Sequence, residues 1–289
     1  MERSSTKVSI QHPNASDCRL VGILEQIASD QPTQGRKLAL ILHGTLGHKD
    51  YLFQKALSNK LPLDSFRFDF RGNNESGGVW KQGALHEDFE DLQAVVAYLK
   101  SGYGYVIDLV VGHSRGAIAG FHWIAASEDG RKASAFVNVS GRYRMERIVE
   151  SDGVKLWLEA FKKQGFYEWE ASVARKKIRV TVTPDDLKSF VNWDTSFVWT
   201  QFPSHTHVLS VHGLQDRVVP PYDAVIYTHA LGNRSPGTAT LHYVETADHN
   251  FTGQKDVVVD AILRWLEDKE RGVLKPVGVS LGEGHKAYL

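Results

Sequence analysis

The fold is decided by the stretch VIDLVVGHSRGAIAGF at residues 106–121. Its first half is a short apolar, β-branched run that predicts a buried strand, and its second half has the small and apolar residues of a packed helix. Gly112 and Gly116 stand two residues either side of Ser114, so the chain can turn sharply from strand to helix without a Cβ clash. The turn should project the Ser114 hydroxyl from the carboxyl edge of a sheet, which is the geometry of a nucleophile elbow.

A second G-x-S-x-G match, GVSLG at residues 278–282, has a different context. It follows Pro276, with no recognisable strand before it and no helix after it. We therefore predict that Ser280 belongs to a loose or surface-docked tail that begins near Gly272.

Strands and helices are expected to alternate along most of the chain. A hairpin-like entry of two short strands, at 7–10 and 20–27, comes first. The remaining strands are predicted at 37–42, 65–70, 106–111, 133–140, 207–211 and 239–244, and the helices at 51–60, 84–100, 117–121 and onward, 222–231 and 255–270. This rhythm predicts an α/β protein with a mostly parallel, eight-stranded sheet and helices on both of its faces.

The rhythm breaks between Gly141 and Ser204, a block that holds four of the seven tryptophans and many charges. A one-faced strand is predicted where Ile178, Val180 and Val182 alternate with polar residues, and the sequence TPDD at 183–186 predicts a helix start. We interpret 142–204 as a cap inserted into a core domain formed by 1–141 and 205–289.

The insertion should emerge at the same sheet edge as Ser114, because it follows the carboxyl end of a strand. Its aromatic side chains Trp157, Phe161 and Trp169 are therefore predicted to bind substrate. The alternative is that these aromatics form a small core of the insertion itself.

Two further polar side chains follow predicted strands later in the chain. The run HGLQDRVVP at 212–220 places Asp216 just past one strand, and ETADHNF at 245–251 places His249 just past the next. An imidazole within reach of a serine can remove its proton, and a buried carboxylate fixes the imidazole tautomer and stabilises the imidazolium. The order Ser114, Asp216, His249 therefore predicts a Ser-His-Asp catalytic triad in the chain order of α/β-hydrolases.

From about Val8 to Glu270 the chain resembles the α/β-hydrolase superfamily in these motifs. Within it, GTLGHKD at 44–50, FDFRG at 68–72 and the insertion resemble cinnamoyl/feruloyl-esterase-like carboxylesterases and similar uncharacterised fungal hydrolases. The resemblance implies an oxyanion hole made by the backbone N–H groups of Thr45 and Arg115. The Arg115 side chain is expected either at the surface or as the partner of a substrate carboxylate.

The combined pattern predicts a serine hydrolase that cleaves a carboxylic ester, thioester or lactone through an acyl-enzyme. One alternative is a C–C bond hydrolase or a cofactor-free oxygenase-type enzyme of the same fold. Another is a ligand receptor that retains the triad.

Charge and composition narrow the classes of partner. Thirty-four basic and thirty-four acidic residues balance, which argues against nucleic acid or an anionic membrane as the main partner. No apolar run approaches a membrane span, and the N-terminus lacks a signal-peptide core. The single cysteine, Cys18, suits a reducing compartment, so we expect a cytoplasmic enzyme, and its substrate should be a small-molecule ester-type compound. We interpret His43 and His113 as packed loop residues and not as metal ligands. The enzyme should need neither metal nor cofactor, and the sequence leaves its oligomeric state open.

Overall fold

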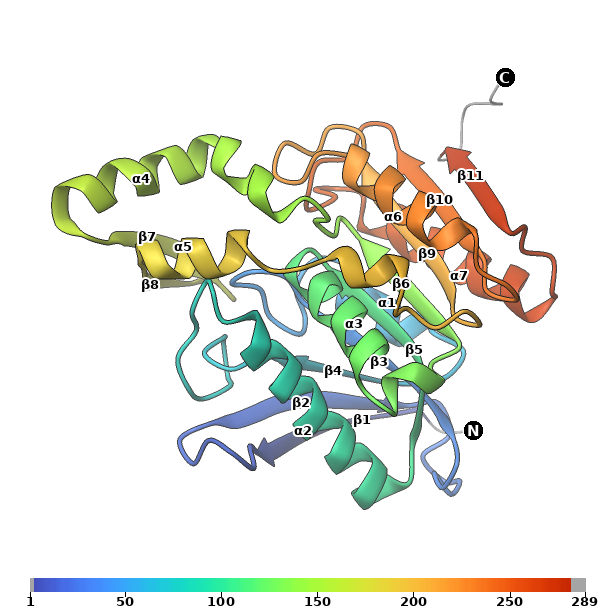
Figure 1. Cartoon of the computed structure of the whole chain (residues 1–289). Coiled ribbons are helices and arrows are strands. Elements are labelled where there is room, and N and C mark those ends of the chain that lie inside the picture. Colours follow the sequence, from blue (N-terminus) through green and yellow to red (C-terminus); the bar gives the residue numbers. More distant parts are fainter. Residues whose placement is uncertain (1–2, 282–289) are drawn as a thin grey trace.

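A long twisted sheet runs through the centre of the molecule (Figure 1). The computed structural model describes residues 3–281, and within them nine strands form this sheet in the order β1-β2-β4-β3-β5-β6-β9-β10-β11. The strands are β1 Ser4–Gln11, β2 Arg19–Gln26, β3 Lys37–Leu42, β4 Asp64–Asp69, β5 Val106–His113, β6 Ala135–Val139, β9 His207–Gly213, β10 Ala239–Val244 and β11 Val277–Leu281. Within this nine-stranded sheet, only the β1–β2 and β2–β4 pairs are antiparallel. The mostly parallel α/β architecture is therefore confirmed, with nine strands in place of the eight predicted.

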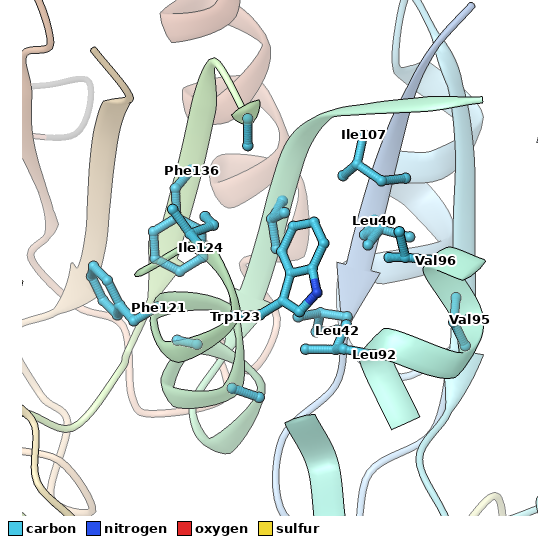
Figure 2. Close-up of a cluster of buried hydrophobic side chains, with 14 of the residues drawn as sticks. Leu40, Leu42, Leu92, Val95, Val96, Ile107, Phe121, Trp123, Ile124 and Phe136 are labelled. Carbon is cyan, nitrogen blue, oxygen red and sulfur yellow. The ribbon is translucent and has the colours of Figure 1, made fainter. Parts of the chain in front are cut away.

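Helices cover both faces of the sheet, as predicted. They are α1 Gln54–Lys60, α2 Leu85–Tyr103, α3 Arg115–Ala126, α6 Tyr222–Gly232 and α7 Lys255–Glu270. Successive side chains of β3 pack on opposite faces of the sheet. Leu40 and Leu42 join the apolar cluster under α2, α3 and α6, whereas Ile41 joins the cluster under α1 and α7. Figure 2 shows the first cluster, where Trp123 of α3 lies beside Leu42 of the sheet and Leu92 of α2. Within residues 3–281, no helix has both the length and the apolarity that crossing a bilayer requires.

The turn from β5 into α3 depends on two glycines that approach other backbone segments closely. A Cβ on Gly116 would lie 2.5 Å from the carbonyl oxygen of His43, and one on Gly112 would lie 2.5 Å from the carbonyl oxygen of Gly116. Neither glycine has a positive φ, so each is needed for close packing and not for a left-handed backbone. The first turn of α3 thereby lies directly against the end of β3.

The insertion lies between β6 and β9. It comprises the 3-10 helix η2 Met145–Glu150, α4 Asp152–Gln164, the antiparallel hairpin of β7 Tyr167–Val173 and β8 Lys176–Val182, α5 Pro184–Val191 and the 3-10 helix η3 Ser196–Trp199. The predicted helix start is confirmed, because Thr183 and Asp186 form a reciprocal capping box at α5. In Figure 1, α4, the hairpin and α5 lie together at the upper left of the molecule. The apolar side chains of α4 and the hairpin pack onto the core through Leu46 and Trp80, which lie in the loops after β3 and β4. Phe197 and Val198 of η3 instead join the cluster under α2, α3 and α6.

The tail predicted from Gly272 to be loose or surface-docked is not loose as far as Leu281. Residues 277–281 form β11, a mostly exposed strand that pairs in parallel with β10 and adds an edge to the sheet, and residues 282–289 lie outside the described residues. The alternation of Val277, Val279 and Leu281 is a strand pattern, but it is short and follows a proline, so the pattern alone is weak. Ser280 lies on this edge strand, with Oγ 2.8 Å from Nδ1 of His242, and therefore outside any elbow.

The packing of Gly116 generates a prediction about stability. Gly116→Ala should lower the free energy of unfolding by about 1–3 kcal/mol, because the new methyl group meets rigid backbone. Gly102→Ala is the matched control, since Gly102 is also helical but exposed, with no atom near the position of its Cβ. It should raise the same free energy by up to about 1 kcal/mol through helix propensity. Denaturant titration measures both variants, and an equal gain at the two positions would contradict the packing described here.

Candidate active site

Ser114 occupies the tip of the turn between β5 and α3. Its φ of 53° and ψ of −118° place it in a strained region of the backbone map, which non-glycine residues adopt only when the surrounding structure fixes them. The constraint comes in part from its backbone N–H, which donates to the carbonyl oxygen of Val139 in β6 at 2.8 Å. The half-buried Ser114 side chain lines a cavity.

The structure brings the three predicted residues of the triad together from three separate loops. Nε2 of His249, in the loop after β10, lies 3.0 Å from Oγ of Ser114. Nδ1 of the same ring lies 2.8 Å from Oδ2 of Asp216, in the loop after β9. With its proton on Nδ1, His249 donates to Asp216 and leaves Nε2 to accept a hydrogen bond from the Ser114 hydroxyl.

The carboxylate of Asp216 is held on both oxygens. Oδ1 accepts hydrogen bonds from the backbone N–H groups of Val218 and Val219, both at 2.8 Å. Oδ2 lies 3.1 Å from Nε2 of His212 in addition to its contact with His249. Burial alone raises the pKa of Asp216, but the hydrogen bonds from His212 and His249 outweigh burial and hold the pKa well below its usual range. Asp216 is therefore ionised at neutral pH.

Two buried histidines support the site without joining the triad. Nε2 of His113 lies 2.9 Å from the carbonyl oxygen of His249, a contact that fixes the backbone of the histidine loop. His43 accepts a hydrogen bond from the Phe70 backbone N–H on Nε2 and lies 2.8 Å from the carbonyl oxygen of Gly44 through Nδ1. Burial lowers the pKa of His43 to about 4 and that of His113 to about 3, so both are neutral. The interpretation of both as packed residues is confirmed, although their positioning contacts were not predicted.

No group of three His, Cys, Asp or Glu side chains among residues 3–281 is arranged to hold a metal ion. His212 and His249, which both contact Asp216, are engaged in the hydrogen bonds just described.

The two predicted oxyanion donors lie on either side of the serine. Thr45 belongs to the loop after β3, Arg115 begins α3, and both residues line the cavity with Ser114. Neither backbone N–H donates a hydrogen bond to another residue in the described part of the chain. A Cβ on Gly44 would lie 3.0 Å from Cβ of Ser114, so the loop that carries Thr45 packs directly against the elbow.

The expectation that the Arg115 side chain lies at the surface was wrong. The side chain is buried, with Nε 2.6 Å from Oδ2 of Asp88 and Nη1 2.7 Å from the carbonyl oxygen of Gln82. Because its guanidinium is paired with a carboxylate of α2, Arg115 ties the elbow helix to its neighbour. This pairing also makes Arg115 a poor partner for a substrate carboxylate.

A cavity of about 540 Å³ opens above Ser114, between the core and the insertion. The insertion contributes Trp157 of α4 and Trp169 of β7 to its lining, together with Tyr167. Phe161 does not line this cavity; it packs into the apolar cluster between α4 and the hairpin. The prediction that Phe161 binds substrate is therefore not supported, because its place on α4 directs it into the insertion's own core.

Comparisons with known proteins agree with this architecture. Residues 39–261 match the alpha/beta hydrolase family. The putative uncharacterized protein YDL057W of Saccharomyces cerevisiae is 26% identical over 267 residues, which covers 80% of this chain and 79% of that protein.

Two solved esterases share the fold at low sequence identity. Est1E from Butyrivibrio proteoclasticus, in a structure with ferulic acid bound, is 18% identical with a TM-score of 0.66, over 91% of this chain and 99% of that one. The Pyrococcus furiosus esterase Pf2001 is 17% identical with a TM-score of 0.67, over 92% of this chain and 91% of that one. The likeness confirms the fold that the motifs predicted.

The contacts of Asp216 predict how two neighbouring acids differ. Asp216→Asn should lower kcat by about 10⁴-fold, because an amide favours the wrong histidine tautomer. Asp248→Asn should change kcat by less than about tenfold, since Oδ1 of Asp248 only accepts hydrogen bonds from the N–H groups of Asn250 and Thr252 in its own turn. Steady-state kinetics with a nitrophenyl ester measures both, and a larger loss for Asp248→Asn would show that the acid is misassigned.

Proposed function

The chain belongs to the alpha/beta hydrolase family, and we propose that it is a serine hydrolase that cleaves a carboxylic ester, thioester or lactone. The observation that carries the proposal is the hydrogen-bonded series of Ser114, His249 and Asp216 at the floor of a cavity. The esterases among its structural neighbours support the same reaction class. The single, buried Cys18 supports action in the reducing cytoplasm.

The proposed reaction begins when Oγ of Ser114 attacks the ester carbonyl and His249 takes the hydroxyl proton on Nε2. Asp216 stabilises the imidazolium that forms. His249 then gives this proton to the departing alcohol, which leaves an acyl group on Ser114. A water molecule, deprotonated by the same ring, attacks the acyl-enzyme; His249 then returns that proton to the departing Oγ of Ser114, and the acid is released.

Negative charge develops on the carbonyl oxygen in each tetrahedral intermediate. The N–H groups of Thr45 and Arg115 would stabilise it, because they belong to backbone that is already fixed against the elbow. Each such donor contributes about 2.7–4 kcal/mol to the lowering of the barrier.

The insertion, residues 142–204, would act as a cap that selects the substrate. Trp157 and Trp169 give its side of the cavity a broad aromatic surface, with their ring centroids 5.5 Å apart. This surface favours substrates with an apolar portion next to the scissile ester.

The two serines in G-x-S-x-G sequences provide the direct test of this proposal. Ser114→Ala should abolish hydrolysis of short nitrophenyl esters, with a loss of about 10⁴-fold or more, and abolish labelling by a fluorophosphonate. Ser280→Ala is the matched control, since Ser280 lies in the edge strand β11 and should keep full activity. Equal losses in the two variants would contradict the assignment of the nucleophile.

Cap aromatics should change substrate preference. Trp157→Ala or Trp169→Ala should shift the ratio of kcat/KM between bulky and short acyl esters by about tenfold, or about 1.4 kcal/mol. Phe161→Ala should cost stability but keep the parent's ratio, because Phe161 does not line the cavity. A panel of acyl esters measures these ratios, and unchanged ratios in both tryptophan variants would mean that the insertion does not select the substrate.

A further inference from the structure

Arg142 is a buried cation at the wall of the cavity that holds Ser114. It follows β6 by three residues and is only 4% exposed, yet it is among the residues that line the cavity. Its Nη2 donates a hydrogen bond to the carbonyl oxygen of Val218, while Nη1 donates to no residue in the described part of the chain. The guanidinium has therefore lost its water without gaining a full set of protein partners.

The contrast with the other buried cations is informative. Three further lysine and arginine side chains among residues 3–281 are buried to a similar degree, and each has a carboxylate partner. These are Lys49 with Asp69, Arg67 with Glu25, and Arg115 with Asp88. Arg142 forms no ion pair with any described acid, so it alone in this group lacks a direct carboxylate partner.

The two acids whose charges act most strongly on Arg142 already have other hydrogen-bond partners. Asp216 is bonded to His249 and His212, and Asp223 pairs with Arg144 at 2.6 Å and accepts two backbone N–H groups. Burial lowers the pKa of Arg142, and the charges of Asp223 and Asp216 oppose that shift. A buried cation without a direct anionic partner is costly, and an anion from outside the chain would relieve that cost.

Other groups around the cavity favour an anion as well. The first turn of α4 lines it, from Ser151 to Val154, and the positive end of a helix dipole lies there. The one acid in that turn, Asp152, has a side chain that is 96% exposed and is paired with Lys155. Arg217 also lines the cavity, but its side chain is exposed, so solvent screens its charge. The cavity therefore combines one buried cation with a helix N-terminus on the side of the insertion.

We propose that the natural substrate carries an ionised carboxylate in addition to its scissile ester, and that Arg142 binds this carboxylate while the ester lies at Ser114. A half-ester of a dicarboxylic acid has this chemistry. The guanidinium suits the role because its planar donors can bind a carboxylate while Val218 keeps one of them. The inference rests on the proposed ester hydrolysis and adds the charge of the substrate to it.

The test uses two esters that differ in that charge and in one methyl group. They are the 4-nitrophenyl monoester of glutaric acid, with a free carboxylate, and the same compound with that carboxyl group blocked as a methyl ester. The parent enzyme should favour the anionic ester in kcat/KM by about tenfold or more, and Arg142→Met should reduce that ratio to about one. Arg142→Lys, which keeps the charge, should retain part of the preference.

The control removes a charge elsewhere in the same lining. Arg217→Gln should move the ratio by less than about threefold, because its exposed charge is screened by solvent. An equal fall with Arg217→Gln would overturn the proposal, since the cavity would then respond to net charge and not to Arg142. If Arg142→Met lowers kcat/KM for both esters by the same factor, the proposal is also overturned, because Arg142 would then only hold the acid loop through Val218.

A binding measurement without turnover tests the role of Arg142 independently of the proposed ester hydrolysis. Calorimetric titration of Ser114→Ala with the two esters requires no turnover, and the anionic ester should bind at least about tenfold more tightly. If the parent cleaves neither ester, the proposed function fails while this comparison still decides the role of Arg142. Equal affinities for the two esters would overturn the inference. Should Arg142→Met not fold, Arg142→Lys and Arg142→Gln in the Ser114→Ala background supply the comparison.

Discussion

The hydrogen-bonded series from Ser114 through His249 to Asp216 can exist only where three loops meet within bonding distance. A parallel sheet meets this condition, because β5, β9 and β10 end at the same edge and each is followed by a loop that carries one of these side chains. Parallel pairing alone does not set distances of 2.8 and 3.0 Å. Local contacts in and between the loops set these distances. The chief ones are the contact of His113 with the carbonyl oxygen of His249 and the hydrogen bonds from two backbone N–H groups to Asp216.

Backbone strain is concentrated at Ser114, the proposed nucleophile, and the surrounding contacts offset it. The backbone of Ser114 costs about 1–3 kcal/mol in its observed conformation. The close packing of Gly112 and Gly116 and the hydrogen bond to Val139 leave the chain no relaxed alternative at this turn. The same packing brings Arg115 and Thr45 into place, so Ser114 and the two proposed oxyanion donors are fixed by one local arrangement and would need little reorganisation during the proposed reaction.

The parts that could be predicted from the sequence are those encoded locally. The strand, the glycines and the helix of residues 106–121 carry their own signal, and chain order identifies Asp216 and His249. The burial of Arg115 depends on Asp88, which lies 27 residues earlier on another helix, so no local pattern announces it. Phe161 and Trp157 share α4, yet only Trp157 lines the cavity, whereas Phe161, one turn later, packs against the apolar cluster of the insertion. The sequence does not predict that Arg142 is buried without a carboxylate partner, because this depends on tertiary contacts that engage Asp223 with Arg144 and Asp216 with His249.

The central claim is that an acyl group passes through Oγ of Ser114. Rapid quenching of the enzyme during turnover of a slowly released nitrophenyl ester, followed by peptide mass spectrometry, measures this directly. The account predicts a mass increase equal to the acyl group on the peptide that contains Ser114, and its absence from the peptide that contains Ser280. Steady hydrolysis with no acylated peptide, or an acyl group on any other residue, would contradict it.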